Sequence, residues 1–178
     1  MLLRKTFRFE ASHVLPKHPG KCSRLHGHSW VLHVEISGSI NQETGFVQDF
    51  ADISKVMTPL VERLDHRHLG AWEVQGEWIP KLHGFDVEGL TEDVYPSSEN
   101  LLIWIAGQIE GLDVYHLIRK DHTPEPFTPY PGQLIETDED EDEEVTLQSY
   151  WSKLALEETC TSYAELTREE FNATRNQK

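Results

Sequence analysis

Two runs near the N-terminus alternate apolar and polar side chains, which is the pattern of strands that bury one face. In residues 3–13 the odd positions are mostly apolar and the even positions are polar. From Trp30 to Ile36 the even positions carry the apolar side chains. We therefore predict two strands, joined by a loop that contains prolines and a glycine.

Two later segments carry apolar residues at helical spacing. In residues 50–64 the apolar positions recur every three or four residues, and Asp49 precedes them as a predicted N-cap. Pro59 is expected to bend or interrupt this helix. A second helix is predicted to begin at Ser97 or Ser98 and to carry an apolar stripe over residues 101–112.

The C-terminal part predicts two short strands, around residues 153–158 and 160–166, before a polar tail ending at Lys178. The resulting order, β-β-α-α-β-β, is typical of an α+β domain with two helices packed on one face of an antiparallel sheet. A chain of 178 residues has the length of one domain, so residues 1–178 are expected to form a single unit.

Two regions interrupt this pattern. Residues 71–96 show no sustained period and are predicted to be a long loop or an insertion. Residues from about 113 to 150 contain several prolines and the acidic run 136–144, which we expect to be flexible because it offers little apolar area to bury. Without the eight acidic residues of that run, the net charge of −15 would be −7.

The overall charge excludes some partners. The excess of 31 acidic over 16 basic residues argues against binding to nucleic-acid phosphates. The first ten residues scatter charges where a secretion signal needs an apolar run, and no stretch approaches the roughly 20 apolar residues of a membrane span. We therefore expect a soluble, cytoplasmic protein in which Cys22 and Cys160 are free thiols.

The most informative segment is Cys22-Ser-Arg-Leu-His26-Gly-His28. Side chains two apart in a strand leave the same face, so His26 and His28 can reach one metal ion. His13 ends the first strand on the parity of its apolar positions. Three neutral imidazoles leave Zn2+ an open fourth position, the catalytic arrangement. The alternative is that the histidines are unrelated core or surface residues.

Two further segments carry candidate acid–base groups. Cys22 lies beside Lys21 and Arg24, whose charges favour a thiolate, although a free cysteine can also be a small buried residue. Asp65–His66 places a carboxylate next to an imidazole, and the same pair can be an ion pair at a helix end. His68 is assigned a structural role.

Glu158 lies in a β-rich stretch, where a buried carboxylate needs a hydrogen-bond donor. A carboxylate can accept two parallel hydrogen bonds from the N–H edge of a guanine-like or pterin ring. The alternative for Glu158 is a strand residue that faces solvent.

Six segments occur in an order that resembles the 6-pyruvoyltetrahydropterin synthase and 6-carboxytetrahydropterin synthase superfamily. They are Phe9–His13, Cys22–His28, Gly45–Phe50, Leu64–Leu69, Ser97–Asn100 and Glu158–Thr161. The three-residue gap between Cys22 and His26 and the Glu-Thr-Cys-Thr segment are more similar to the carboxytetrahydropterin branch, which serves queuosine and other 7-deazaguanine pathways.

The resemblance implies a tunnelling fold (T-fold) that oligomerises, as a trimer or hexamer, into a barrel with active sites at subunit interfaces. It implies conversion of 7,8-dihydroneopterin triphosphate to 6-carboxytetrahydropterin, with release of acetaldehyde and triphosphate. The alternatives are 6-pyruvoyltetrahydropterin synthesis or another pterin side-chain cleavage, and a non-catalytic protein that binds a pterin or a protein partner.

The same resemblance assigns roles to individual residues. The zinc ion would act on the side-chain hydroxyls of the pterin, the thiol would move protons at the side-chain carbons, and the imidazole of the Asp–His pair would be its partner. The implied metal ligands are His13, His26 and His28, the catalytic residues are Cys22, His66 and Asp65, and the substrate-binding residues are Glu158, Ser97 and Glu99.

Overall fold

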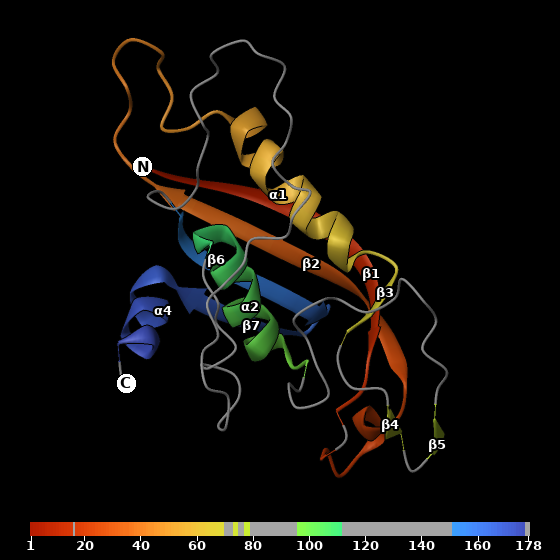
Figure 1. The fold of residues 1–178 in the computed structure, drawn as a ribbon. Helices are drawn as coiled ribbons and strands as arrows, with labels where there is room; N and C mark the ends of the chain where they lie inside the picture. The colour runs from red at the N-terminus through yellow and green to blue at the C-terminus, as the bar shows by residue number, and fades with distance from the viewer. Residues whose placement is uncertain (16, 70–72, 75–76, 79–95, 112–150, 177–178) are drawn as a thin grey trace.

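A long antiparallel hairpin forms the centre of the structure, a computed structural model (Figure 1). Strands β1 (Leu2–His13) and β2 (His26–Ser37) pair over their whole length, with Leu2 opposite Ser37 and His13 opposite His26. The predicted alternation is confirmed, because the apolar side chains of both strands share one buried face.

The structure describes residues 1–15, 17–69, 73–74, 77–78, 96–111 and 151–176. The second predicted insertion, with the acidic run 136–144, and most of the first, 71–96, therefore lie outside the described residues. Within the first predicted insertion, residues 71–96, two short strands pair antiparallel: β4 (Glu73–Val74) and β5 (Glu77–Trp78). The sequence pattern predicted a loop there. They are too short to show an alternating pattern.

Three more strands complete a five-stranded sheet of order β3-β1-β2-β6-β7. β6 (Trp151–Thr159) pairs antiparallel with β2, and β7 (Ser162–Thr167) pairs antiparallel with β6. Cys160, predicted to open the last strand, lies in the turn between them. β3 (Arg67–Leu69) runs parallel to β1, so the sheet is mixed rather than antiparallel throughout. Three residues after a helix are too few to predict this strand from alternation.

Both predicted helices are present. α1 (Phe50–Leu64) begins at Asp49, whose side chain accepts a hydrogen bond from the amide nitrogen of Ala51 at 2.7 Å. Pro59 lies inside α1, which continues to Leu64 because its last turns bury apolar residues against the sheet. α2 (Ser98–Glu110) has Ser97 as its N-cap and Gly111 as its C-cap, and Gly111 adopts the left-handed conformation typical of that position.

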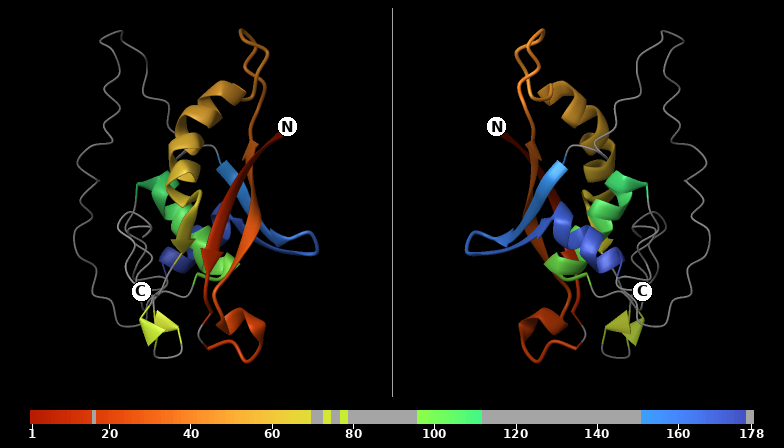
Figure 2. Two further views of the ribbon diagram at one scale, coloured as in Figure 1. Left: turned by 90° about the vertical axis from the view of Figure 1, so that its right-hand side faces the viewer. Right: turned by 90° about the vertical axis from the view of Figure 1, so that its left-hand side faces the viewer.

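A third helix, α4 (Arg168–Arg175), replaces part of the predicted polar tail. It buries one apolar residue, Phe171, against Trp151, and so has no apolar stripe to indicate it. Its signal in the sequence is the capping box formed by Thr167 and Glu170. Figure 2 shows α1, α2 and α4 on the same side of the sheet, and none of the helices in the described part of the chain is long and apolar enough to cross a membrane.

The face of the sheet that these helices leave open is polar. The Nδ1 atom of His33 is hydrogen-bonded to the hydroxyl of Thr6 at 2.9 Å, and its Nε2 atom to the carboxylate of Glu157 at 2.7 Å. These two hydrogen bonds join β1, β2 and β6. Glu35, 3% exposed, forms ion pairs with Arg4 and with Lys153. The apolar face covered by the helices continues, at the end of β1 and the start of β2, into a group of histidines.

Candidate metal centre

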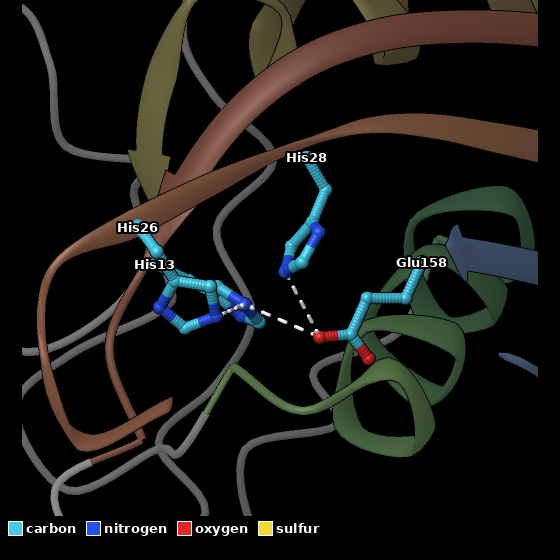
Figure 3. A group of neighbouring side chains, drawn as sticks. All are labelled: His13, His26, His28 and Glu158. Carbon is cyan, nitrogen blue, oxygen red and sulfur yellow. Dashed lines mark hydrogen bonds and ion pairs between the residues drawn. The ribbon is translucent and has the colours of Figure 1, made fainter. Parts of the chain in front are cut away.

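Four side chains meet at one end of the sheet (Figure 3). His13 is the last residue of β1, His26 and His28 open β2, and Glu158 lies near the end of β6. Each offers one ligand atom, and these atoms lie within 4.8 Å of one another. The β1–β2 register places His13 directly opposite His26, and the two-residue spacing adds His28 on the same face.

Backbone carbonyls fix the orientation of two imidazoles. The Nδ1 atom of His13 lies 2.8 Å from the carbonyl oxygen of Pro96, and that of His26 lies 2.7 Å from the carbonyl oxygen of Arg24. A carbonyl oxygen can only accept, so each Nδ1 carries the hydrogen. In both neutral rings the Nε2 atom therefore carries no hydrogen and has a free lone pair.

These lone pairs point at one another. The Nε2 atoms of His13 and His26 are 3.0 Å apart, and two lone pairs at this separation repel each other unless a proton or a cation lies between them. The Nε2 atom of His28 is buried and has no hydrogen-bond partner among the described residues. Three imidazole nitrogens directed to one point, two of them oriented by carbonyls, fit the donor set and outer hydrogen bonds of a zinc site.

Burial keeps His13 and His28 neutral. Burial, with a smaller contribution from the neighbouring His26, lowers the pKa of His13 from 6.5 to about 4, against the opposing effect of the Pro96 carbonyl. Burial also lowers the pKa of His28, while the carboxylate of Glu158 opposes this shift. The neutral imidazole is the form that binds metal, so the site needs no proton release from these two rings at pH 7.

Glu158 turns toward the histidines. Its Oε1 atom lies 3.4 Å from Nε2 of His13 and 3.2 Å from Nε2 of His28. Its Oε2 atom accepts a hydrogen bond of 3.0 Å from the hydroxyl of Ser98. The side chain is 22% exposed, so Glu158 does not simply face solvent.

Asp65 and His66 form a second group just beyond α1. Asp65 accepts a hydrogen bond from the amide nitrogen of Glu10 at 2.7 Å, and its other carboxylate oxygen lies 2.8 Å from Nδ1 of His66. His66 has a positive φ of 55° and donates its own N–H to the carbonyl of Glu10 at 2.6 Å. Both residues lie outside the helix, which allows neighbouring side chains to meet. The Glu10 N–H, and then the His66 ring, lower the pKa of Asp65.

A hollow of about 750 Å³ lies beside Asp65 and His66. Its lining includes His28 from the metal group together with Asp65 and His66. In the part of the chain that the structure describes, neither Asp65 nor His66 makes a hydrogen bond or ion pair with a member of the metal group.

The other predicted site residues lie around these groups. Cys22 is half-buried in the short helix η1 (Lys21–Ser23), and its carbonyl accepts a hydrogen bond from the amide of Leu15 at 2.9 Å, which holds the loop beside the end of β1. Its thiol is not part of the four-residue group. Ser97 caps α2, and Glu99 is exposed in the first turn of that helix.

The residue that sequence patterns missed is Ser98. It lies between Ser97 and Glu99, is 7% exposed and contacts Glu158 through its hydroxyl. The sequence offered one signal, a pair of serines at a predicted helix start, of which one caps the helix and the other is available for a different contact.

Comparison with known proteins agrees with this architecture. Residues 2–117 match the family described as 6-pyruvoyl tetrahydropterin synthase. The chain is 36% identical over 118 residues to the 6-carboxy-5,6,7,8-tetrahydropterin synthase of Synechocystis sp., covering 64% of this chain and 78% of that protein. It is 38% identical over 66 residues to the Haemophilus influenzae protein of the same name, covering 35% of this chain and 47% of that one.

The fold is shared with solved structures. The structure of Caenorhabditis elegans 6-pyruvoyl tetrahydropterin synthase superposes with a TM-score of 0.57, at 18% identity, and covers 94% of both chains. At that identity the similarity establishes the fold, a T-fold, as the family resemblance implied.

Proposed function

The chain belongs to the 6-pyruvoyl tetrahydropterin synthase family, and we propose that it is a zinc-dependent lyase that cleaves the side chain of a dihydropterin triphosphate. The observation that carries this proposal is the convergence of three imidazole Nε2 atoms, two of them with their Nδ1–H groups committed to backbone carbonyls. His13, His26 and His28 would hold the ion. When bound, zinc polarises a hydroxyl or carbonyl oxygen of the substrate.

The reaction we propose is conversion of 7,8-dihydroneopterin triphosphate to 6-carboxytetrahydropterin, with release of acetaldehyde and triphosphate. The names of the Synechocystis and Haemophilus relatives support this product. The family description and the Caenorhabditis structure carry the pyruvoyl name, so 6-pyruvoyltetrahydropterin is the second candidate product.

Residues of this chain supply the proton transfers. Cys22 exchanges protons with the side-chain carbons of the substrate, and His66 is its partner acid or base. The carboxylate of Asp65, 2.8 Å from Nδ1 of His66, fixes the orientation of that ring and favours a proton on Nδ1, leaving Nε2 free to exchange one. Glu158 accepts hydrogen bonds from the N–H edge of the pterin ring.

Product analysis tests the proposal directly. The zinc-loaded chain is incubated with 7,8-dihydroneopterin triphosphate, and the products are identified by mass spectrometry. A carboxypterin with acetaldehyde supports the first candidate, and a pyruvoylpterin supports the second. Recovery of unchanged substrate under conditions where a Synechocystis control turns over would contradict an enzymatic role and favour a binding protein.

A further inference from the structure

We propose that Glu158 is a displaceable fourth ligand of the metal, which closes the site until a pterin ring takes over its carboxylate. The ligand role stands on the geometry of this chain, and the displacement by a pterin rests on the proposed function. In the substrate-free protein the fourth coordination position would then be filled by Glu158 rather than open.

Three of the distances between the four ligand atoms are close to those of a tetrahedron around one ion, and all of the atoms lie within 4.8 Å of one another. Zinc bound at about 2.0 to 2.1 Å places neighbouring tetrahedral ligands about 3.3 Å apart. The His13–His26 separation is 3.0 Å, and the carboxylate oxygen Oε1 of Glu158 lies 3.4 Å from His13 and 3.2 Å from His28. These separations are close to the edge of such a tetrahedron. Because Nε2 of His13 carries no hydrogen, its approach to Oε1 of Glu158 is not a hydrogen bond, and an ion bound by both atoms would account for it.

A hydrogen bond holds the carboxylate in this orientation. Ser98, 7% exposed at the start of α2, donates its hydroxyl to Oε2 of Glu158 at 3.0 Å. That contact engages one oxygen and leaves Oε1 directed at the histidines. Ser98 is therefore a positioning residue for the metal ligand, of the kind that orients ligands in metal sites.

The carboxylate has two competing partners. Bound to the metal it neutralises one of the two charges of Zn2+ and excludes a substrate oxygen. Bound to a pterin ring it accepts two N–H hydrogen bonds and leaves the metal open. Recognition of the ring would thus release the position at which the side-chain hydroxyl of the same substrate binds.

The test replaces zinc by Co2+ in the full chain and follows the visible absorption bands, which report coordination, during titration with thiocyanate. We expect weak thiocyanate binding in the wild type and binding about tenfold or more tighter in Glu158→Ala, because the competing ligand is gone. Ser98→Ala is expected to be intermediate. Glu157→Ala is the matched control, since Glu157 precedes Glu158 on β6 but binds His33 on the opposite face.

A second arm tests displacement with pterin that lacks the side chain and so cannot supply a hydroxyl to the metal. It should increase thiocyanate affinity in the wild type and have no effect in Glu158→Ala. Glu158→Gln, which preserves the shape of the side chain, serves if the alanine variant fails to fold. Equal thiocyanate affinity in the wild type and both Glu158 variants would overturn the ligand role, and an unchanged wild-type affinity with pterin bound would overturn displacement.

Failure of the proposed function would be seen separately. The cobalt spectra without pterin depend on the ligand set alone, whereas product analysis of the zinc protein depends on the reaction. A chain that produces neither pterin product but still shows the Glu158 effect on thiocyanate would retain the fourth ligand and lose the lyase assignment.

Discussion

At the scale of single residues, two hydrogen bonds from imidazole N–H groups decide which ring nitrogens can bind the metal. The carbonyls of Pro96 and Arg24 accept hydrogen bonds from the Nδ1–H groups of His13 and His26. The Nε2 atom of each ring therefore presents its lone pair to the same point. Pro96 is far along the chain from His13, and its carbonyl is brought to the site by the entry to α2. The ligand orientation therefore depends on a residue that carries no side-chain chemistry of its own.

Replacing a histidine of this group should remove the metal. We expect the wild type to contain about one zinc per chain and His26→Ala to contain far less, because only two imidazoles and the displaceable carboxylate of Glu158 would remain as ligands. Metal analysis of the freshly purified proteins measures this. His33→Ala is the control, since His33 lies in β2 on the opposite face of the sheet. Full zinc content in His26→Ala would contradict the assignment.

The buried imidazole of His13 should also make the metal-free protein sensitive to acid. Its pKa is about 4 in the folded chain and 6.5 as the ordinary value. Between these values the unfolded state binds a proton that the folded state does not, so stability is lost as pH falls from about 6.5 to about 4. Urea unfolding of chelator-treated protein at pH 7 and pH 5 measures this loss. His13→Gln should show a smaller difference, and an identical difference would exclude His13 as its source.

The sequence predicted the three histidines but not the contacts of Glu158. Parity within β1 and β2 is a local property, and a single hairpin register brings His13, His26 and His28 together. Glu158 reaches the histidines because β6 pairs with β2. The register between β6 and β7 shifts just after Glu157. Sequence alternation cannot specify that pairing between distant segments, nor the position of Ser98 beside the carboxylate.

At the scale of elements, the end of α1 determines how Asp65 and His66 work. Helical geometry would have separated their side chains, and for that reason the sequence alone did not favour the pair. Termination of α1 at Leu64, followed by the positive φ of His66, brings them within 2.8 Å. β3 then continues beside β1, so the pair is fixed to the edge of the sheet by backbone hydrogen bonds to Glu10.

Removing the Asp65 carboxylate should therefore affect stability as well as activity. We expect Asp65→Ala to lower the free energy of unfolding by about 1 kcal/mol, because the Glu10 N–H loses its acceptor. Urea unfolding gives this value, with Glu62→Ala, an exposed residue of α1, as control. Unchanged stability would mean that water satisfies the Glu10 N–H equally well.

At the scale of the whole molecule, the two candidate groups are separate within the described residues, and His28 is the one member of the metal group that lines the hollow beside Asp65 and His66. The resemblance placed active sites at the interfaces of an oligomer, in which Cys22 of one subunit and His66 of the next could serve one site. The central strands, with their alternating faces, made the fold itself predictable from the sequence. The assembly depends on surfaces that alternation does not describe, so it stays a prediction.

Mixing two inactive variants tests that assembly. We expect Cys22→Ala and His66→Ala to abolish turnover separately while retaining zinc. Co-expressed in one oligomer, they should recover on the order of a quarter of the wild-type activity, because a quarter of randomly formed interfaces combine both intact residues. Activity assays and mass measurement of the mixed oligomer check this. Absence of recovery in a confirmed mixed oligomer would place both residues in one subunit.

The pairing of β1 with β2 has a consequence for how the protein folds. The three histidines belong to one hairpin, whose residues are close in sequence, whereas β6 must close a much longer loop to deliver Glu158. Local contacts form before distant ones at lower entropic cost, so the hairpin can capture zinc before the sheet is complete. We expect refolding from urea to be faster with zinc than with a chelator, measured by tryptophan fluorescence after stopped-flow dilution. Equal rates would show that the ion binds after folding is complete. Faster refolding with zinc would mean that the ion organises the folding of the hairpin in addition to its role as cofactor.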